Sequence, residues 1–456
     1  MKALKSTSSP LVDLFYNIGA SRGKDIIPAF VAAYVENKEL AVRIALWARD
    51  ARGGAGERKV FRDIFEYLCV NDPELANRLV HKVPELGRWD DLLTAKGNVR
   101  NAAFEFISLG LRDKSTAGLV AKWMPRKGEV AVELRQFLGM SPKQYRKTLV
   151  GLTDVVESKM CANLWEQIDF NKVPSVASAR YKKAFNKHSV KFAEYVEKLA
   201  KGDADVKVNA GAVYPYDILK GFCSSYYGKA YDATELKHIE AQWNALPNFV
   251  GEASILPLVD VSGSMTCPAG GRGSKSMVTC LDVSISLGLY LADKNKGKFK
   301  DTFLTFSSKP ELMHLKGNIL QKVQQMAKSD WGMDTNLHAA LDKILETALN
   351  GNVSQDEMPN TLLILSDMQF NQCVRHDDSA IQMIARKYES AGYTMPNVVF
   401  WNLNASYGNT PVDHSRKGVA LVSGFSPSLV QNLGSFENMT PEKIMLDTIM
   451  KERYNF

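Results

Sequence analysis

The sequence predicts two domains: an all-α helical-repeat (HEAT-like) domain over residues 1–250 and an α/β doubly wound (Rossmann-like) domain over residues 251–456. The length of 456 residues exceeds what one ordinary hydrophobic core supports, so more than one domain is expected. Up to about residue 245, apolar residues recur at spacings of three and four, which is typical of helices. From residue 254, short apolar runs alternate with helical stretches, which is typical of a parallel sheet with helices on both faces.

Three helical segments begin the first domain. Residues 28–54 have helical periodicity and end in glycines, residues 56–70 resume the same period, and residues 73–87 follow after it, beginning with proline. Repeated units of helix, glycine or proline turn and helix are typical of the stacked helical hairpins of a solenoid, although no strict sequence repeat accompanies them. The segment 244–253, which contains proline and glycine, is the predicted junction between the domains.

Four short runs of apolar, β-branched or aromatic residues are expected to form strands of the second domain: 254–260, 299–306, 360–367 and 397–404. Helical stretches lie between them at 278–294, 336–350 and 380–392. Ligands of such sheets bind at the carboxyl ends of the strands. Asp260 and Asp367 end two of the predicted strand segments, so we expect both carboxylates at that edge of the sheet.

Oxygen-bearing side chains alternate at the end of the first predicted strand, at Asp260, Ser262 and Ser264. Thr335 stands just before a predicted helix, and Asp367 ends another strand segment. Two carboxylates and three hydroxyls would supply hard oxygen ligands, which suit Mg²⁺ or Mn²⁺ rather than zinc. Hydroxyls coordinate without adding charge, so the cation would still attract an acidic group of a partner. The alternative interpretation is an aspartate that caps a turn, with the serines as local hydrogen-bond partners.

These three loops, in this order, resemble the metal-ion-dependent adhesion site of von Willebrand factor A domains. The resemblance covers roughly residues 254–456, and it implies that the cation is bound by Asp260, Ser262, Ser264, Thr335 and Asp367. The second loop differs from the family pattern. Many such domains have Thr followed by Asp, whereas here Asp334 precedes Thr335 and Asn336 follows it. The difference affects the hydrogen bonding around the metal ligands rather than the ligand itself.

A wider resemblance includes the helical half. The segments that carry it are 46–61, 86–93, 121–128, 171–188 and 398–425. They are similar to a family of uncharacterised plant and phage proteins that join a helical domain to a von Willebrand factor A domain. The same architecture is found in Ro autoantigen-like proteins, whose TROVE module is a ring of helical repeats that binds RNA. The resemblance implies that the helical domain binds RNA.

Positive charge is concentrated in the helical half. Residues 1–250 contain 38 Lys and Arg against 29 Asp and Glu, whereas residues 251–456 contain 19 against 21. Cations hold phosphates, and aromatic faces can stack on unpaired bases. The candidate RNA-binding residues lie in basic segments that contain glycine turns or aromatic residues: Arg49, Arg52, Arg58, Lys143, Arg146, Lys147, Arg180, Lys182, Lys183, Lys187 and His188.

Two structural interpretations compete with RNA binding at these segments. The cations around residues 143–188 could form a solvated helix face while Tyr145, Tyr181 and Phe185 point into the core. The glycines of residues 49–59 could simply end one helix and start the next.

The expected function is that of a non-catalytic RNA-binding protein of ribonucleoprotein type. The helical domain would hold single-stranded or structured RNA, and the second domain would hold Mg²⁺ or Mn²⁺ and an acidic group of a protein partner. One alternative is a protein-assembly adaptor without RNA, such as a phage structural or host-takeover component. Another is a metal-dependent nuclease or phosphatase that uses Asp260 and Asp367, although no general base is evident.

Composition favours a cytoplasmic protein. The six cysteines are scattered without a CxxC pair, which is typical of reduced thiols. No run of eighteen apolar residues is present, so no membrane span is expected.

Overall fold

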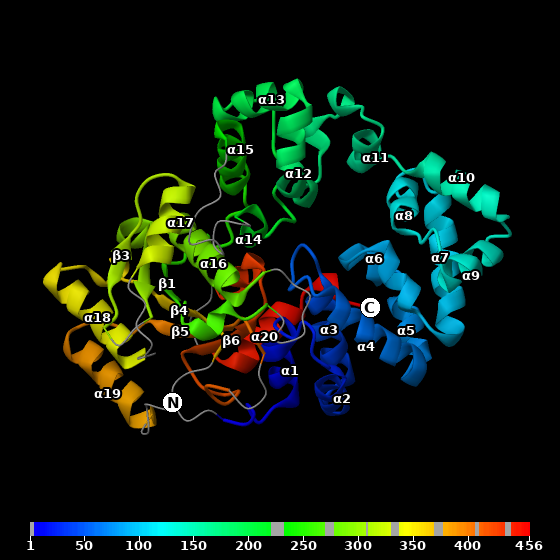
Figure 1. Ribbon diagram of the computed structural model, residues 1–456. Coiled ribbons are helices and arrows are strands. Elements are labelled where there is room, and N and C mark those ends of the chain that lie inside the picture. The colour runs from blue at the N-terminus through cyan, green and yellow to red at the C-terminus, as the bar shows by residue number, and fades with distance from the viewer. Residues whose placement is uncertain are drawn as a thin grey trace.

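The protein consists of a helical first part and an α/β second part built on one six-stranded sheet (Figure 1). The predicted order of a helical part and an α/β part is therefore confirmed. The computed structural model describes residues 4–219, 232–269, 278–306, 309–329, 337–368, 377–405, 410–433 and 439–456.

Short helices make up the first part of the chain. They are α1 (Pro10–Ile18), α2 (Ile27–Glu36), α3 (Lys38–Arg49), α4 (Arg58–Asn71), α5 (Pro73–Leu79), α6 (Lys82–Leu86), η1 (Trp89–Thr94), α7 (Gly97–Arg112), α8 (Ala117–Trp123), α9 (Glu129–Phe137), α10 (Pro142–Leu152), α11 (Val156–Cys161), η2 (Trp165–Gln167), η3 (Phe170–Lys172), α12 (Ser175–His188), α13 (Val190–Ala200), α14 (Pro215–Ile218) and α15 (Ala233–Asn244). In Figure 1 they run in an arc from α1–α4 beside the sheet, through α7–α10, to α12, α13 and α15.

Local capping explains why the predicted stretch 28–54 forms two helices rather than one. The side chain of Asn37 accepts a hydrogen bond from the N–H of Leu40 at 3.0 Å, which starts α3 directly after α2 ends. Asp72 caps α5 in the same way, with Pro73 at the first helical position, where a missing N–H costs nothing. Helices this short are marginal alone, so their packing on neighbouring helices stabilises them.

The sheet has the strand order β3-β2-β1-β4-β5-β6. Its strands are β1 (Ile255–Val259), β2 (Thr302–Thr305), β3 (Leu312–His314), β4 (Thr361–Ser366), β5 (Asn397–Asn402) and β6 (Val419–Ser423). The neighbours pair in parallel, except β2 and β3, which are antiparallel. Further helices of this part are η4 (Gly263–Thr266), α16 (Cys280–Lys294), η5 (Gly297–Phe299), α17 (Ile319–Lys328), α18 (Leu337–Asn350), η6 (Gln355–Glu357), α19 (Asp377–Ser390), η7 (Pro427–Leu433), α20 (Pro441–Ile449) and η8 (Glu452–Tyr454).

Helices cover both faces of the sheet, as the alternation of strands and helices predicts. Leu256 and Leu258 of β1 belong to an apolar cluster that includes residues of α18 and α19. Ile255 and Val259, which point to the other face, belong to the core that includes α16 and α17. The strand order reverses between β1 and β4, so the carboxyl ends of these two strands lie side by side.

Both ends of the helical arc contact the α/β part. At the first end, the N–H of Gly19 donates to the hydroxyl of Ser423 at 3.0 Å, and that hydroxyl donates to the carbonyl of Phe15 at 3.1 Å. A side chain on Gly19 would collide with the backbone of Ser423, because a Cβ there would lie 2.4 Å from its carbonyl oxygen. At the other end, the indole of Trp243 in α15 donates to Asp293 of α16 at 3.1 Å.

The last residues of the chain also bind the first helices. The carboxylate of Asp50 is buried, and it accepts hydrogen bonds from Arg453 at 2.5 and 2.9 Å and from the hydroxyl of Tyr454 at 3.1 Å. Helix α20 packs on α3 beside this contact. The first and last parts of the sequence therefore fold together.

Candidate functional site

The carboxyl edge of β1 and β4 holds a buried carboxylate. Asp260 comes directly after β1 and is 3% exposed, and its N–H donates to the carbonyl of Leu365 in β4 at 3.0 Å. One carboxylate oxygen accepts from the N–H of Ser262 at 2.9 Å, and the other accepts from the hydroxyl of Ser366 at 2.6 Å. The position that the sequence predicts for Asp260, at the end of a buried strand, is confirmed.

Burial raises the pKa of the Asp260 carboxyl, and the hydrogen bonds from Ser366 and Ser262 oppose the rise. A divalent cation bound at this carboxylate would oppose it more strongly, because a metal ion is the largest charge in its surroundings. A cation bound here would therefore offset the cost of keeping the Asp260 carboxylate charged in the interior.

Two hydroxyls lie next to each other in the turn that follows. The Oγ atoms of Ser262 and Ser264 are 3.0 Å apart, at the start of η4. The N–H of Met265 donates to the carbonyl of Ser262 at 3.0 Å, and the hydroxyl of Thr266 donates to the carbonyl of Gly263 at 2.7 Å. The local hydrogen bonds of a capped turn are therefore present together with the grouping of oxygen atoms that a hard cation prefers.

Asp367 follows the adjacent strand β4 and is fully buried, which confirms its predicted place at the same edge. The predicted ligand Thr335 lies outside the described residues. Within the described ranges, no three His, Cys, Asp or Glu side chains form a group that could hold a metal ion.

The structure adds Ser366 to the residues that the sequence singles out at this edge. Its hydroxyl binds Asp260 and also accepts from the N–H of Met368 at 3.1 Å. The only sequence signal for it is a hydroxyl at the end of an otherwise apolar strand. The oxygen atoms of Asp260, Ser262, Ser264 and Asp367 could hold a hard divalent cation.

One cation of the basic segment at residues 49–59, Arg49, is part of the interior. Arg49 is 3% exposed, and its guanidinium binds the fully buried carboxylate of Asp91 through two nitrogens, each at 2.7 Å. The guanidinium of Arg62 binds the other oxygen of Asp91 at 2.7 Å. Arg49 is therefore out of reach of a ligand on the surface, whereas Arg52 and Arg58 are exposed.

Helices α10 and α12 present most of the remaining candidate cations to solvent. Lys143, Arg146 and Lys147 are exposed on one face of α10, and Arg180, Lys183 and Lys187 are exposed on one face of α12.

Lys182 differs from its neighbours on α12. Its side chain is 7% exposed and its ammonium donates to the carbonyl of Ala179 at 3.0 Å, so it belongs to the interior. Burial lowers the pKa of Lys182 to about 8. The prediction that Lys182 binds a ligand on the surface does not fit this placement.

Most of the aromatic residues in these segments do not face solvent. Tyr145 and Phe185 are buried, as the competing structural interpretation predicts for them. Tyr181 is half-buried, and its hydroxyl donates to Glu157 at 3.3 Å. The exposed His188 stacks on Trp165 with ring centroids 4.7 Å apart, so this pair offers the clearest aromatic surface.

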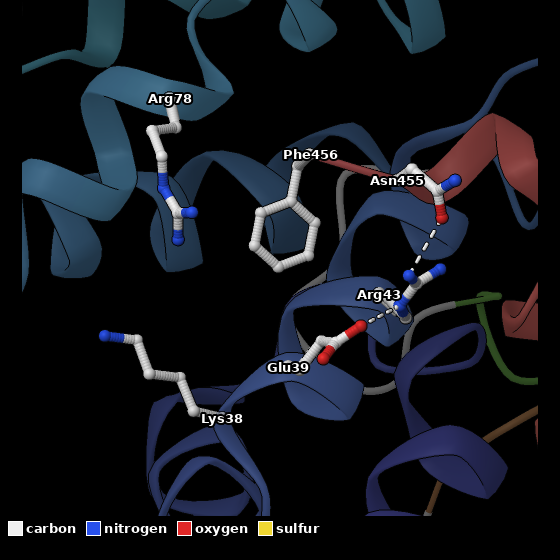
Figure 2. A pocket seen from close by; sticks show the side chains of 6 residues that line it. All are labelled: Lys38, Glu39, Arg43, Arg78, Asn455 and Phe456. Atoms are coloured by element: carbon white, nitrogen blue, oxygen red, sulfur yellow. Dashed lines mark hydrogen bonds and ion pairs between the residues drawn. The ribbon is translucent and has the colours of Figure 1, made fainter.

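A separate cavity of about 470 Å³ lies where the C-terminal residues meet α3 and α5. Figure 2 shows the six side chains that line it: Lys38, Glu39, Arg43, Arg78, Asn455 and Phe456. The guanidinium of Arg43 binds Glu39 at 3.0 Å and Asn455 at 2.8 Å, and that of Arg78 lies 5.6 Å from the ring centre of Phe456. Lys38 pairs with Asp72. Since residues from both ends of the chain form it, no local sequence pattern could predict this cavity.

Within the part of the chain that the structure describes, no helix combines the length and apolar character that crossing a membrane requires.

The fold and the polar sheet edge define a protein in which a helical region precedes an α/β region with a candidate cation site. Residues 124–254 match the domain of unknown function DUF2828, and residues 254–452 match the domain of unknown function DUF7788. The chain is 30% identical over 510 residues to the uncharacterized protein L728 of Acanthamoeba polyphaga mimivirus, covering 98% of this chain and 86% of L728. The chain belongs to the same family as L728.

Proposed function

We propose that the protein is a non-catalytic RNA-binding protein of Ro ribonucleoprotein type. The helical region holds single-stranded or structured RNA. The α/β region is a von Willebrand factor A-like domain that holds Mg²⁺ or Mn²⁺ and an acidic group of a protein partner. The proposal of RNA binding rests on the row of exposed cations on α10, which is Lys143, Arg146 and Lys147. A similar row on α12 is Arg180, Lys183 and Lys187.

The cations on α10 repel one another without local compensation. Lys143 lies three and four residues before Arg146 and Lys147, so all three charges share one helix face. They form no ion pair with any residue that the structure describes. Like charges at this spacing destabilise a helix by about 0.2–0.5 kcal/mol per pair. A polyanion that binds along the row would remove this cost and release counterions.

Some surface cations of the α/β part are paired, whereas others, such as Lys300, Lys316 and Lys328, are exposed and form no ion pair with a described residue. Lys298, Lys387 and Lys443 each pair with an acidic side chain, at 2.8, 2.6 and 2.7 Å. The grouping of three unpaired cations on one helix face, rather than the lack of an ion pair at any single one, supports a polyanionic ligand at α10.

Three features support the metal part of the proposal. The strand order reverses between β1 and β4, where ligands of doubly wound sheets bind. Asp260 and Asp367 lie at the carboxyl ends of these two strands, and the paired hydroxyls of Ser262 and Ser264 follow the first. The resemblance to the metal-ion-dependent adhesion site adds the same four residues and Thr335.

The test of RNA binding is a titration of fluorescent single-stranded RNA at several salt concentrations. Changing Lys143, Arg146 and Lys147 together to Gln should weaken binding and lower the slope of log K against log salt by about 2, at about 0.7 for each phosphate contact. A matched control changes Lys298, Lys387 and Lys443 to Gln, which alters the net charge equally. The control should keep the wild-type slope.

Three other outcomes of this titration would contradict the proposal. Equal losses of RNA affinity in both triple variants would mean that net charge alone causes the effect. The rows on α10 and α12 would then not be the RNA surface. Absence of RNA binding in the wild type would overturn the proposal and favour the RNA-free adaptor. Cleavage of the RNA that disappears in Asp260→Asn would favour the nuclease alternative.

Cation binding is tested by thermal unfolding in EDTA and in increasing Mg²⁺ or Mn²⁺. At a concentration ten times the dissociation constant, bound cation should stabilise the protein by about 1.4 kcal/mol. Asp260→Asn should abolish this gain, whereas the exposed Asp356→Asn should keep it. Equal stabilisation of all three proteins would place the cation elsewhere.

A further inference from the structure

Two thiols lie in contact at the same edge of the sheet, Cys267 after η4 and Cys280 at the start of α16. Their sulfur atoms are 3.6 Å apart. The backbone brings them together: the N–H of Cys280 donates to the carbonyl of Cys267 at 3.0 Å, and the N–H of Ala269 donates to that of Val278 at 2.7 Å. Pro268 and Thr279, which are adjacent to the two cysteines, form an isolated antiparallel bridge. Cys267 and Cys280 are therefore directly opposite each other.

This backbone arrangement suits a disulfide. Residues that face each other in an antiparallel pair have Cα atoms about 4.5–5.5 Å apart. Disulfides form when that distance is about 4.4–6.8 Å. Since the thiols already touch, closing the bond requires only side-chain rotation and a small approach of the two sulfur atoms.

The two thiols differ in exposure, as an attacking and a resolving thiol do. Cys267 is half-buried, whereas Cys280 is fully buried and donates to the carbonyl of Leu403 at 3.4 Å. A disulfide from solution can reach only a thiol with exposed surface, so Cys267 is the attacking thiol and Cys280 is the resolving thiol.

Neighbouring side chains hold Cys267 in place. The amide of Asn404 donates to its sulfur at 3.5 Å, and the ammonium of Lys24 donates to the oxygen of that amide at 3.1 Å. The positive charge of Lys24 also favours the thiolate of Cys267. Hydrogen-bond donors and a nearby cation are the surroundings that reactive cysteines use.

We propose that Cys267 and Cys280 form a thiol–disulfide exchange site whose substrate is a small oxidised disulfide of the glutathione class. The thiolate of Cys267 attacks one sulfur of that disulfide, the S–S bond breaks, and one glutathione thiolate leaves. The proton of Cys280 then passes to the departing glutathione thiolate, and the Cys280 thiolate attacks the sulfur of Cys267 and expels the second glutathione thiolate. Two protein thiols are oxidised to one disulfide, and one small disulfide is reduced to two thiols.

The exchange chemistry needs neither RNA nor a bound cation, so it stands apart from the proposed function. Its product would join the turn that carries Ser264 to the first residue of α16. The other described cysteines lack such a partner: Cys69 is buried and burial raises the pKa of its thiol, and Cys161 is exposed and has no described cysteine beside it. Cys223 and Cys373 lie outside the described residues.

The experiment incubates the reduced full-length protein with oxidised glutathione at pH 7, blocks the remaining thiols and maps tryptic peptides without reduction. Peptides 238–272 and 276–294 contain one cysteine each, Cys267 and Cys280. We expect them joined, with the number of free thiols falling from six to four. Absence of the joined pair, or preferential pairing of either cysteine with another, would overturn the proposal.

Variants separate the two roles. Cys280→Ser should keep glutathione on Cys267 as a mixed disulfide, whereas Cys267→Ser should form neither the adduct nor the joined peptides. Cys161→Ser is the matched control and should form the joined peptides as the wild type does.

Discussion

Two regions of the helical part are both rich in Lys and Arg but have different surroundings. Around α3 and α4, the guanidinium groups of Arg49 and Arg62 are bound to the buried Asp91. On α10, Lys143, Arg146 and Lys147 are exposed and form no ion pair with a described residue. The first region uses its positive charge to hold the fold together, and the second leaves its charge available to a ligand.

The difference shows why counts of charge do not locate a binding surface. Arg49 has no acidic residue three or four positions away, and neither has Arg146. The partner of Arg49 is Asp91, 42 residues further along the chain. Only the folded arrangement of the helices brings them together, so the sequence alone could not distinguish the two regions.

Removing the central carboxylate of the first region should have the largest effect. Asp91→Ala leaves the buried Arg49 without its counterion, which we expect to lower the free energy of unfolding by about 3–5 kcal/mol. Urea unfolding measures this loss. The control is Asp63→Ala, which breaks the exposed pair with Lys59 and should cost less than about 1 kcal/mol. Similar losses in both variants would contradict the distinction between a structural and an open basic region.

The buried Lys182 tests the same distinction within α12. Its folded-state pKa of about 8 lies below the ordinary 10.5, so the unfolded chain binds more protons between these pH values. Stability should therefore rise with pH from about 8 to 10.5, and below pH 8 the full cost of the buried charge is present. Lys182→Met should be more stable than the wild type by about 3 kcal/mol at pH 7.

Urea unfolding at pH 7, 9 and 10.5 checks this expectation, since the gain of Lys182→Met should shrink above pH 8 and vanish near 10.5. The exposed neighbour Lys183→Met should give no such pH-dependent difference. A gain for Lys182→Met that is constant across this range would mean that lost packing or hydrogen bonding, not charge, decides the effect.

The second row of exposed cations should affect RNA binding and leave the fold unchanged. Changing Arg180 and Lys187 to Gln should lower the salt slope of RNA binding by about 1.4, at about 0.7 for each phosphate contact. The free energy of unfolding should stay within about 0.5 kcal/mol of the wild type, because both side chains are exposed. An unchanged slope would confine the RNA surface to α10.

The smallest effect is expected at Arg58, an exposed cation of the first region. Burial lowers the pKa of Arg58, and the positive charges of Arg88 and Arg62 lower it further; Arg58 and Arg62 are four residues apart on α4. Arg58→Gln should therefore leave the free energy of unfolding unchanged or raise it by less than about 0.5 kcal/mol. Lys59→Gln, which loses the pair with Asp63, should lower it by a similar amount. A clear loss of stability in Arg58→Gln would mean that this side chain helps to hold the fold together, as Arg49 and Arg62 do.

Much of the fold follows from local patterns, and the parts that do not have physical reasons. The predicted strands correspond to β1, β2, β4 and β5, whose apolar runs are buried on both faces. The pattern does not single out β3, because this antiparallel edge strand is only three residues long and partly exposed. It also leaves β6, α17 and α20 unassigned, since the packing of distant segments decides these elements.

The candidate site shows the same division between local and distant information. The positions of Asp260 and Asp367 follow from strand ends, which a sequence displays. The bond from Ser366 to Asp260 spans 106 residues. The contact between Cys267 and Cys280 spans 13 residues and depends on a backbone bridge, so a search for CxxC motifs overlooks it.

The contact between the two ends of the chain has a consequence for synthesis on the ribosome. Gly19 and Asp50 bind residues that are made 404 and 403 positions later. At about 5–20 residues per second, the apolar faces of α1 and α3 wait about 20–80 s for β6 and α20. During that interval, nascent chains on one messenger expose the same unfinished surface to one another. The first helices of a growing chain are therefore covered only after β6 and α20 have been made, and a chain that stops before these elements would keep them uncovered.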